Sequence, residues 1–333
     1  MWKEEIILRE QNPNSKSQIP VRPFLSSQPN RLTENSNARI ITVAGKRCRI
    51  ELDDGTRTEA IARGRLFEED RNNAVVVGDR VTVNESGGVW TVDEVLPRRN
   101  EFVRQGLRRE RQVLFSNADR VLILASLAEP QTKPAAIDRF LVASLQGEIP
   151  SVLVLTKTDQ DEGHEREREM RDLYAGFHLP VFPVCNFTGQ GIDSLADHIR
   201  EGVSAVVGNS GVGKSSLLNR LVPGLDLVVR EVSAWSGKGT HTTTAALLVQ
   251  SGAQAQLIDT PGMKSFVPYG ITKENLAELF PDIAELAPEC RFSDCRHVVE
   301  PGCAVLNAVE KERLPGSRWR SYQRMWEEIE EPY

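Results

Sequence analysis

The sequence predicts a multidomain protein, with a small β-barrel of the OB type at the N-terminus, a central α/β domain and a helical zinc-binding domain at the C-terminus. Short β-rich runs separated by turn signals occupy residues 38–96. From residue 117, apolar runs alternate with helical stretches, which is typical of a parallel, doubly wound α/β sheet. Three cysteines and a histidine gather between residues 290 and 303. A chain of 333 residues has room for two or three such domains.

Composition divides the chain into five segments. Residues 1–37 are rich in Asn, Ser, Gln and Pro and are expected to form a flexible tail. Residues 38–98 hold about five short strands, which favours an OB-like barrel, with an SH3-like barrel as the alternative. Residues 99–116 are interpreted as a basic linker, residues 117–268 as the α/β domain and residues 269–333 as the zinc-binding domain.

Charge and hydropathy exclude some classes of protein. The formal net charge of −6 gives no global positive field that would draw the whole chain to nucleic acid or to an acidic membrane. No run of 18 apolar residues occurs, so we expect a cytoplasmic protein without a membrane partner. Six arginines between residues 98 and 111 are either a solvated hinge or contacts to phosphate.

A phosphate-binding loop is the clearest motif. Residues 208–215, GNSGVGKS, fit the pattern G-x-x-x-x-G-K-[ST] between an apolar strand and an apolar-periodic helix. Glycines let backbone N–H groups turn toward phosphates, the lysine reaches the β- and γ-phosphates, and the last serine binds Mg²⁺. The predicted residues are Gly208, Asn209, Ser210, Gly211, Val212, Gly213, Lys214 and Ser215.

A second motif, Asp259-Thr260-Pro261-Gly262, follows the apolar run AQLI. The Asp259 carboxylate is expected to hold Mg²⁺ through water, and the Gly262 N–H to meet the γ-phosphate. Between the two motifs, SGKGTHTTTAAL is the predicted switch segment, and Thr243 is assigned as a second Mg²⁺ ligand. Its neighbours Thr242 and Thr244 remain alternatives, as does the start of a β-strand.

The base-binding residues are predicted at the end of another strand. Thr156-Lys157-Thr158-Asp159 follows the run SVLVL, at the carboxyl end of a strand where α/β proteins bind ligands. Asp159 can accept both N1–H and N2–H₂ of guanine, and Lys157 offers an aliphatic stem to the ring. Residues 184–191, VCNFTGQG, could direct backbone N–H groups to the guanine O6. A metabolic P-loop kinase or ATPase, in which TKTD is accidental, is the alternative.

The order of these motifs is unusual. Small GTPases present the phosphate loop first, then the switch, DxxG and the base-binding segments, whereas here the base-binding segments come first. The sequence therefore predicts a circularly permuted P-loop GTPase domain. In this order the DTPG motif leads through MKSFVPYG into the C-terminal domain, so sensing of the γ-phosphate would act directly on that domain.

The metal site is predicted from spacing. Cys290-x4-Cys295-x-His297-x5-Cys303 supplies three thiolates and one imidazole, a soft and closed set of four that indicates one structural Zn²⁺. No further carboxylate or open position argues for catalysis by this metal. Reduced free cysteines in a loop are the alternative.

One catalytic element is missing. Many GTPases place a Gln after DxxG to orient the attacking water, but here Met263 and Lys264 follow. The sequence therefore predicts slow intrinsic hydrolysis. His241, within the switch segment, is our first choice for the orienting residue, and a purely structural switch role is the alternative. A nucleotide-occupancy switch with negligible turnover is the competing function.

Taken together, TKTD, GNSGVGKSSL, HTTT and DTPG between an OB-like barrel and a Cys–His module resemble the RsgA/YjeQ family of circularly permuted, ribosome-associated GTPases, over residues 38–333. The resemblance implies a GTPase that acts late in maturation of the small (30S) ribosomal subunit, binds it through rRNA, is stimulated by it, and is a monomer. It carries over the guanine and zinc ligands above, residues 207–215 including Val207 for phosphate, and Lys214 and His241 for catalysis. Thr156 departs from the Asn usual in small GTPases, but its hydroxyl can still tie neighbouring loops together.

Overall fold

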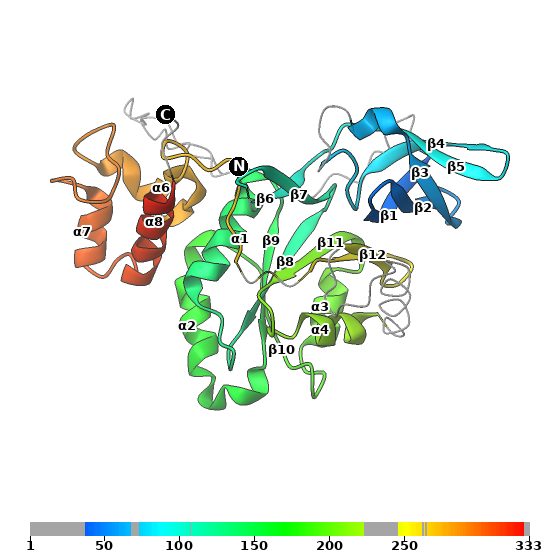
Figure 1. Ribbon diagram of the computed structural model, residues 1–333. Coiled ribbons are helices and arrows are strands. Elements are labelled where there is room, and N and C mark those ends of the chain that lie inside the picture. Colours follow the sequence, from blue (N-terminus) through cyan, green and yellow to red (C-terminus); the bar gives the residue numbers. More distant parts are fainter. Residues whose placement is uncertain are drawn as a thin grey trace, which may run out of the picture.

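The computed structural model describes residues 37–67, 73–106, 108–222, 246–261, 263 and 265–329. Figure 1 shows a small barrel at one end, a central layered domain and a helical domain at the other end. The barrel and the helical domain contact the central domain at separate places, which are described below.

The N-terminal barrel is closed by five strands in the order β1-β2-β3-β5-β4, with β1 paired again to β4. β3 and β5 run parallel and the other pairs antiparallel. Alternate residues such as Ile40, Ile50 and Val92 are fully buried inside it. This strand order confirms the predicted OB-like barrel. The elements are β1 (Ala38–Ala44), β2 (Arg47–Leu52), β3 (Arg57–Ala62), η1 (Gly64–Phe67), β4 (Arg80–Ser86) and β5 (Val89–Val95).

A β-hairpin joins the barrel to the central domain. β6 (Glu101–Gln105) and β7 (Arg111–Ser116) pair antiparallel within the segment interpreted as a basic linker. Phe102 of β6 and Phe115 of β7 are fully buried and stack with ring centroids 5.0 Å apart. Phe266, beyond the central sheet in sequence, stacks on Phe102 at 5.4 Å. The hairpin is therefore part of the core of the central domain.

The central sheet has six strands in the order β10-β9-β8-β11-β13-β12. All neighbours run parallel except β12, which is antiparallel to β13 at the edge. Every residue of β9 is buried, as expected for a parallel strand covered on both faces. Figure 1 shows α1 and α2 on one face and α3 and α4 on the other. The elements are β8 (Arg120–Ser126), α1 (Pro134–Gln146), β9 (Ser151–Thr156), η2 (Thr158–Gln160), η3 (Glu162–His164), α2 (Glu165–Leu173), η4 (Ala175–Phe177), β10 (Val181–Val184), α3 (Ile192–His198), β11 (Glu201–Gly208), α4 (Lys214–Leu221), β12 (Leu247–Gln250) and β13 (Gln254–Asp259).

The C-terminal domain is a small group of helices around its own apolar core. Phe280 and Tyr322 are fully buried there and meet edge to face, and Val142 of α1 belongs to the same core. The shared residue Val142 shows that this domain packs directly on α1. Its elements are η5 (Ala277–Leu279), α6 (Pro281–Leu286), η6 (Ala287–Glu289), α7 (Ala304–Glu310) and α8 (Gly316–Glu328).

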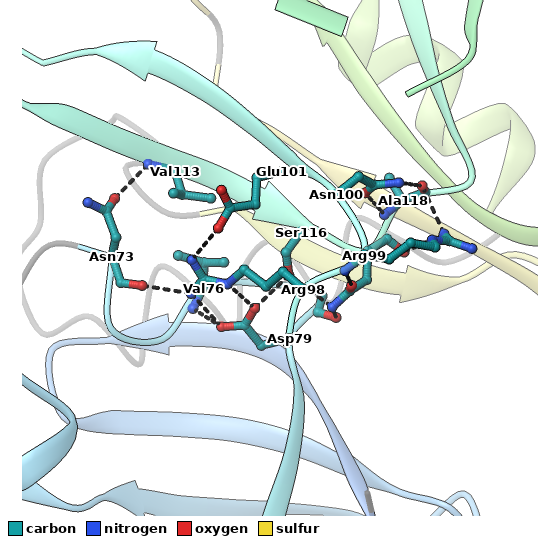
Figure 2. Close-up of polar contacts among 12 residues, drawn as sticks. Asn73, Val76, Asp79, Arg98, Arg99, Asn100, Glu101, Val113, Ser116 and Ala118 are labelled. Atoms are coloured by element: carbon teal, nitrogen blue, oxygen red, sulfur yellow. Dashed lines mark hydrogen bonds and ion pairs between the residues drawn. The ribbon is translucent and has the colours of Figure 1, made fainter. Parts of the chain in front are cut away.

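A buried polar network fastens the barrel to the hairpin (Figure 2). Asp79 is fully buried and accepts hydrogen bonds from Arg98 Nε at 2.7 Å and Ser116 Oγ at 2.6 Å. Arg98 also donates to Glu101 Oε1 at 2.8 Å and to the Asn73 carbonyl at 2.6 Å. Arg98 is therefore neither part of a solvated hinge nor a contact to phosphate, because its guanidinium is hydrogen-bonded to protein groups.

A second contact between the two domains, which we call the seam, joins Arg39, Ile41 and Thr42 of β1 to the outer strands β12 and β13 of the central sheet and the residue before β12. The Thr42 hydroxyl donates to the Ala246 carbonyl at 3.2 Å, and Arg39 donates to the Gln256 side chain on β13. Ile41, between them, is 5 % exposed and belongs to the core of the central domain. β1 shifts its pairing register between Ile40 and Thr42, which is how one strand serves two cores.

A candidate nucleotide site and a candidate zinc centre

The phosphate-binding loop lies between the end of β11 at Gly208 and the start of α4 at Lys214. Gly211 and Gly213 have φ values of +84° and +93°, which favour glycine. A Cβ on Gly213 would lie 2.9 Å from Asn186 Nδ2, and one on Gly211 would lie 2.9 Å from a ring carbon of Pro130. The backbone of this loop therefore depends on glycine at both positions. The first part of the loop, Val207 and Gly208, is buried, whereas Ser210 is exposed.

Lys214 and Asp259 meet beside this loop. Lys214 Nζ lies 3.4 Å from Asp259 Oδ1, and the two side chains are 10 % and 17 % exposed. Burial lowers the pKa of Lys214 and raises the pKa of Asp259, while each charge opposes the shift of the other. Asp259 Oδ1 is buried, and its contact with Lys214 Nζ at 3.4 Å is too long for a well-formed hydrogen bond. The Asp259 carboxylate and the hydroxyl of Ser215, the residue after Lys214, are oxygen donors of the kind that a hard cation such as Mg²⁺ prefers, so these residues fit the expected ion.

The segment Thr156–Asp159 follows β9, two strands away from β11 in the sheet. The Thr156 hydroxyl donates to the Val212 carbonyl at 2.6 Å, which links this segment to the phosphate loop. Lys157 has a left-handed backbone with φ of +60°, and its Nζ donates to the Glu129 carbonyl. Thr158 is buried, whereas Asp159 is exposed. The structure thus places the predicted base-binding and phosphate-binding segments together at the carboxyl ends of the parallel strands β9 and β11.

Three contacts of Cys185 and Asn186 were not predicted from the sequence. Cys185 is fully buried and its thiol donates to Asp159 Oδ1 at 3.1 Å. Asn186 Nδ2 donates to the Gly213 carbonyl at 3.1 Å, and Arg220 of α4 donates to the Asn186 carbonyl at 2.9 Å. Cys185 and Asn186 lie within the quoted VCNFTGQG stretch, but nothing in the local pattern pointed to Arg220.

Some predicted residues lie outside the described part of the chain. These are the proposed catalytic residue His241, the switch threonines, Gly262 of DTPG, and Lys264. The neighbouring Met263 is 3 % exposed, and its N–H lies 3.4 Å from the Gly208 carbonyl. The Met263 backbone is therefore joined to the phosphate loop, and its side chain belongs to the buried core of the central domain.

The four predicted metal ligands converge in the C-terminal domain. Their ligand atoms all lie within 4.8 Å of one another, and they belong to Cys290, Cys295, His297 and Cys303. His297 Nδ1 lies 3.5 Å from the sulfurs of Cys290 and Cys303, which are 3.9 Å apart. Tetrahedral zinc with ordinary bond lengths would require about 3.6 Å between nitrogen and sulfur and about 3.8 Å between sulfurs. The spacing of Cys290, His297 and Cys303, with Cys295 within 4.8 Å and the donor types of all four, fits one zinc ion bound through Nδ1.

The surroundings hold these ligands in place. Backbone N–H groups of Ala304 and Leu306 donate to the sulfurs of Cys290 and Cys303 at 3.3 and 3.5 Å. Trp319 Nε1 donates to the His297 carbonyl at 2.9 Å. Burial lowers the pKa of His297, which favours the neutral imidazole that binds metals. Residues of α7 and α8 therefore hold the ligands in position through hydrogen bonds, as residues around a bound metal usually do.

A parallel sheet with a phosphate loop and a base-binding segment at one edge defines a P-loop nucleotide-binding domain, and the motif order makes it a permuted one. The family model described as RsgA GTPase matches residues 95–267. The chain is 34 % identical to the "Small ribosomal subunit biogenesis GTPase RsgA" of Bacteroides fragilis, over 88 % of this chain and 96 % of that protein. The protein of the same name from Chlorobaculum parvum is also 34 % identical, over 90 % and 100 %. The chain belongs to the RsgA GTPase family.

Solved structures agree with this assignment. YjeQ from Thermotoga maritima superimposes with a TM-score of 0.71 and 29 % identity, over 88 % of this chain and 98 % of that one. YloQ, described as a circularly permuted GTPase, gives a TM-score of 0.64 and 27 % identity, over 91 % and 100 %. The predicted permuted fold is thereby confirmed. Within the part of the chain that the structure describes, no helix is long and apolar enough to cross a membrane.

Proposed function

We propose that this chain is a GTP hydrolase that binds the small ribosomal subunit through rRNA in the cytoplasm, as a monomer, and assists a late step of its maturation with subunit-stimulated turnover. The convergence of Lys214, Asp259 and Asp159 at one edge of the sheet carries the GTPase part. The small-subunit part is supported by the names of the Bacteroides fragilis and Chlorobaculum parvum relatives.

The residues at the site would bind the phosphates, the Mg²⁺ ion and the guanine base. Lys214 neutralises charge on the β- and γ-phosphates, and N–H groups of residues 207–215 bind the phosphate oxygens. Ser215 and Asp259 hold Mg²⁺, which supplies electrophilic stabilisation of the phosphate oxygens when bound. Asp159 accepts the guanine N1–H and N2–H₂, and Lys157 packs its stem on the ring. The roles of Thr243 as a second Mg²⁺ ligand and of Gly262 at the γ-phosphate rest on their motifs alone.

The attacking water needs an orienting group, which Met263 cannot supply because its side chain is apolar and buried. We assign that task to His241, on the basis of its place in the HTTT motif. A bound partner that positions this imidazole for the attacking water would raise the rate of hydrolysis, which would account for stimulation by the subunit.

The barrel and the zinc centre serve binding. Exposed cations lie on and beside β2 and β3: Lys46, Arg47, Arg57, Arg63 and Arg65. Arg57 and Arg63 form ion pairs with Glu51 and Asp93, so Lys46 and Arg47 are the first candidates for contacts to RNA phosphates. Zn²⁺ on the three cysteines and His297 holds a domain that is too small to be stable by its core alone.

The test is GTP turnover by the purified protein, with and without small ribosomal subunits, repeated for Lys214→Ala and His241→Ala. We expect strong stimulation that either substitution abolishes. Flat turnover with retained GTP binding would instead identify a nucleotide-occupancy switch, which the buried Met263 would then explain. Preference for ATP over GTP would indicate a P-loop kinase or ATPase.

A further inference from the structure

The loop between β10 and α3, residues 185–190, is a compact turn that we call the base loop. Its backbone is closed by hydrogen bonds from the Cys185 N–H to the Gln190 carbonyl at 2.9 Å and from the Gly189 N–H to the Cys185 carbonyl at 2.8 Å. The Thr188 N–H donates to the Cys185 sulfur at 3.3 Å. Because the loop is closed on itself, it can be moved or held as one unit.

Arg220 attaches this unit to the helix that follows the phosphate loop. Its Nε donates to the Asn186 carbonyl at 2.9 Å, and its Nη2 donates to the Phe187 carbonyl at 2.7 Å. Arg220 lies in α4, the helix that begins at Lys214. Gly189 has φ of +88°, and a Cβ there would lie 3.9 Å from Arg220 Nη1, so the loop backbone faces the guanidinium. A planar guanidinium can span two carbonyls in this way, which a lysine ammonium cannot match.

A third contact runs in the other direction. Asn186 Nδ2, from the base loop, donates to the carbonyl of Gly213, which precedes Lys214. The base loop is therefore tied to the phosphate loop and to α4 by three hydrogen bonds from two side chains. These segments belong to opposite sides of the motif order, since the base loop precedes β11 and α4 follows it.

Asp159 is held by a separate contact. The Cys185 thiol donates to Asp159 Oδ1, so the carboxylate that faces the N1 and N2 side of guanine is oriented from the base loop. The loop backbone faces the O6 side under the proposed function. Different residues therefore position the groups on the two sides of the base. Cys185 orients the Asp159 carboxylate on the N1 and N2 side, and Arg220 holds the base loop on the O6 side.

We propose that Arg220 is a positioning residue for base recognition, which fixes the base loop to the phosphate-loop helix so that its N–H groups meet O6, while Cys185 sets the orientation of Asp159. This inference rests on the proposed guanine-nucleotide binding. Under the proposed function neither residue is among those that bind Mg²⁺ or the γ-phosphate, so we expect the hydrolytic step at saturating GTP to be independent of Arg220.

Calorimetric binding of GDP, IDP and ADP separates the two roles, because IDP keeps O6 and lacks the N2 amine, whereas ADP lacks O6. In Arg220→Met we expect GDP and IDP to weaken by the same factor, about tenfold, since two hydrogen bonds to a charged group are lost. The preference for GDP over ADP falls, the ratio of GDP to IDP affinity stays at its wild-type value, and kcat for GTP is unchanged. In Cys185→Ala we expect the GDP to IDP ratio to fall severalfold.

Arg168→Met is the matched control, because Arg168 donates to the Gly163 carbonyl in the same domain, away from the base loop. It should leave all three affinities unchanged. Arg220→Lys keeps the charge and should recover only part of the loss. The unfolding midpoint of each nucleotide-free variant separates a local change from a general loss of structure.

The inference is overturned if Arg220→Met binds GDP as tightly as wild type, or changes the GDP to IDP ratio as much as Cys185→Ala does. It is also overturned if kcat falls with unchanged affinity. If the wild-type protein fails to prefer GDP to ADP, the guanine specificity of the proposed function fails first, and that result is visible before any variant is compared.

Discussion

A buried ion cluster between the central domain and the C-terminal domain offers a direct test of how the two are joined. Arg318 of α8 and Asp138 of α1 have fully buried side chains and form an ion pair, and Arg318 Nε also donates to Asp282 at 2.8 Å. The Tyr174 hydroxyl donates to Asp138 at 2.9 Å. Burial alone would lower the pKa of Arg318, but Asp138 and Asp282 raise it above its ordinary value. The guanidinium therefore stays charged.

The perturbation is Arg318→Met, which keeps apolar volume and removes the charge. Asp138 would then be a carboxylate in a fully buried site without a counter-ion, a situation that costs about 3–5 kcal/mol. The guanidinium also lies 4.6 Å from the ring centre of Phe177 and 4.9 Å from that of Phe280, and losing these cation–π contacts adds about 1 kcal/mol. Adding Asp138→Leu removes the stranded charge, so the double variant should recover to within about 1 kcal/mol of wild type.

Urea denaturation with zinc retained, followed by tryptophan fluorescence, measures these differences, because Trp319 and Trp326 lie on α8. The Tyr174 hydroxyl keeps a partner in the double variant, since it also donates to the Pro134 carbonyl at 3.1 Å. A single variant that loses less than about 1 kcal/mol would refute the reasoning about the uncompensated carboxylate. A double variant no more stable than Arg318→Met would show that packing around the guanidinium, rather than charge, holds the domains together.

Three further predictions concern separate places in the fold. Chelation of zinc should abolish hydrogen-exchange protection of α7 while calorimetric GDP binding persists, and protection that survives chelation would argue against a structural ion. Gly213→Ala should weaken GDP binding more than tenfold, because φ is +93° and Asn186 Nδ2 lies 2.9 Å from the added Cβ; wild-type affinity would contradict that geometry. Arg98→Met should cost about 3 kcal/mol in urea because it strands the buried Asp79, with the exposed Arg108→Met as control; equal losses would count against the network.

The fold was predictable where local pattern and burial agree. The run SVLVLT is buried at every residue, and the alternating runs of the barrel place one face inside it. The direction of β12 could have been predicted too: only three residues separate it from β13, too few for a parallel crossover. The hairpin β6–β7 was not predicted, because its charged side chains find their partners only across the formed hairpin: Arg111 pairs with Glu101, and Arg104 donates to Gln112. The attachment of the hairpin to the barrel could not be predicted either. Arg98 meets Asp79 nineteen positions away, a pairing that no local pattern encodes.

The site was predictable as a set of motifs but not as a set of contacts. Glycine spacing identifies the phosphate loop because the backbone itself must approach phosphates, and the Cys–His spacing identifies a metal site for a similar reason. Arg220 has no such mark, since an arginine on an amphipathic helix is ordinary. Its task exists only because the fold brings the carbonyls of Asn186 and Phe187 to α4.

The seam between the barrel and the central sheet leads toward the reacting end of the nucleotide site. Arg39 of β1 contacts Gln256, and three residues further along β13 lies Asp259. The Thr42 hydroxyl contacts the carbonyl of Ala246, the residue immediately before β12. If the nucleotide at Asp259 changes how tightly the barrel holds RNA, linkage requires RNA on the barrel to change nucleotide affinity by the same factor. If the barrel were only tethered to the central domain, nucleotide would not change RNA affinity and RNA would not change nucleotide affinity. The contacts of Arg39 and Thr42 with the central domain are the structural reason to expect both affinities to change.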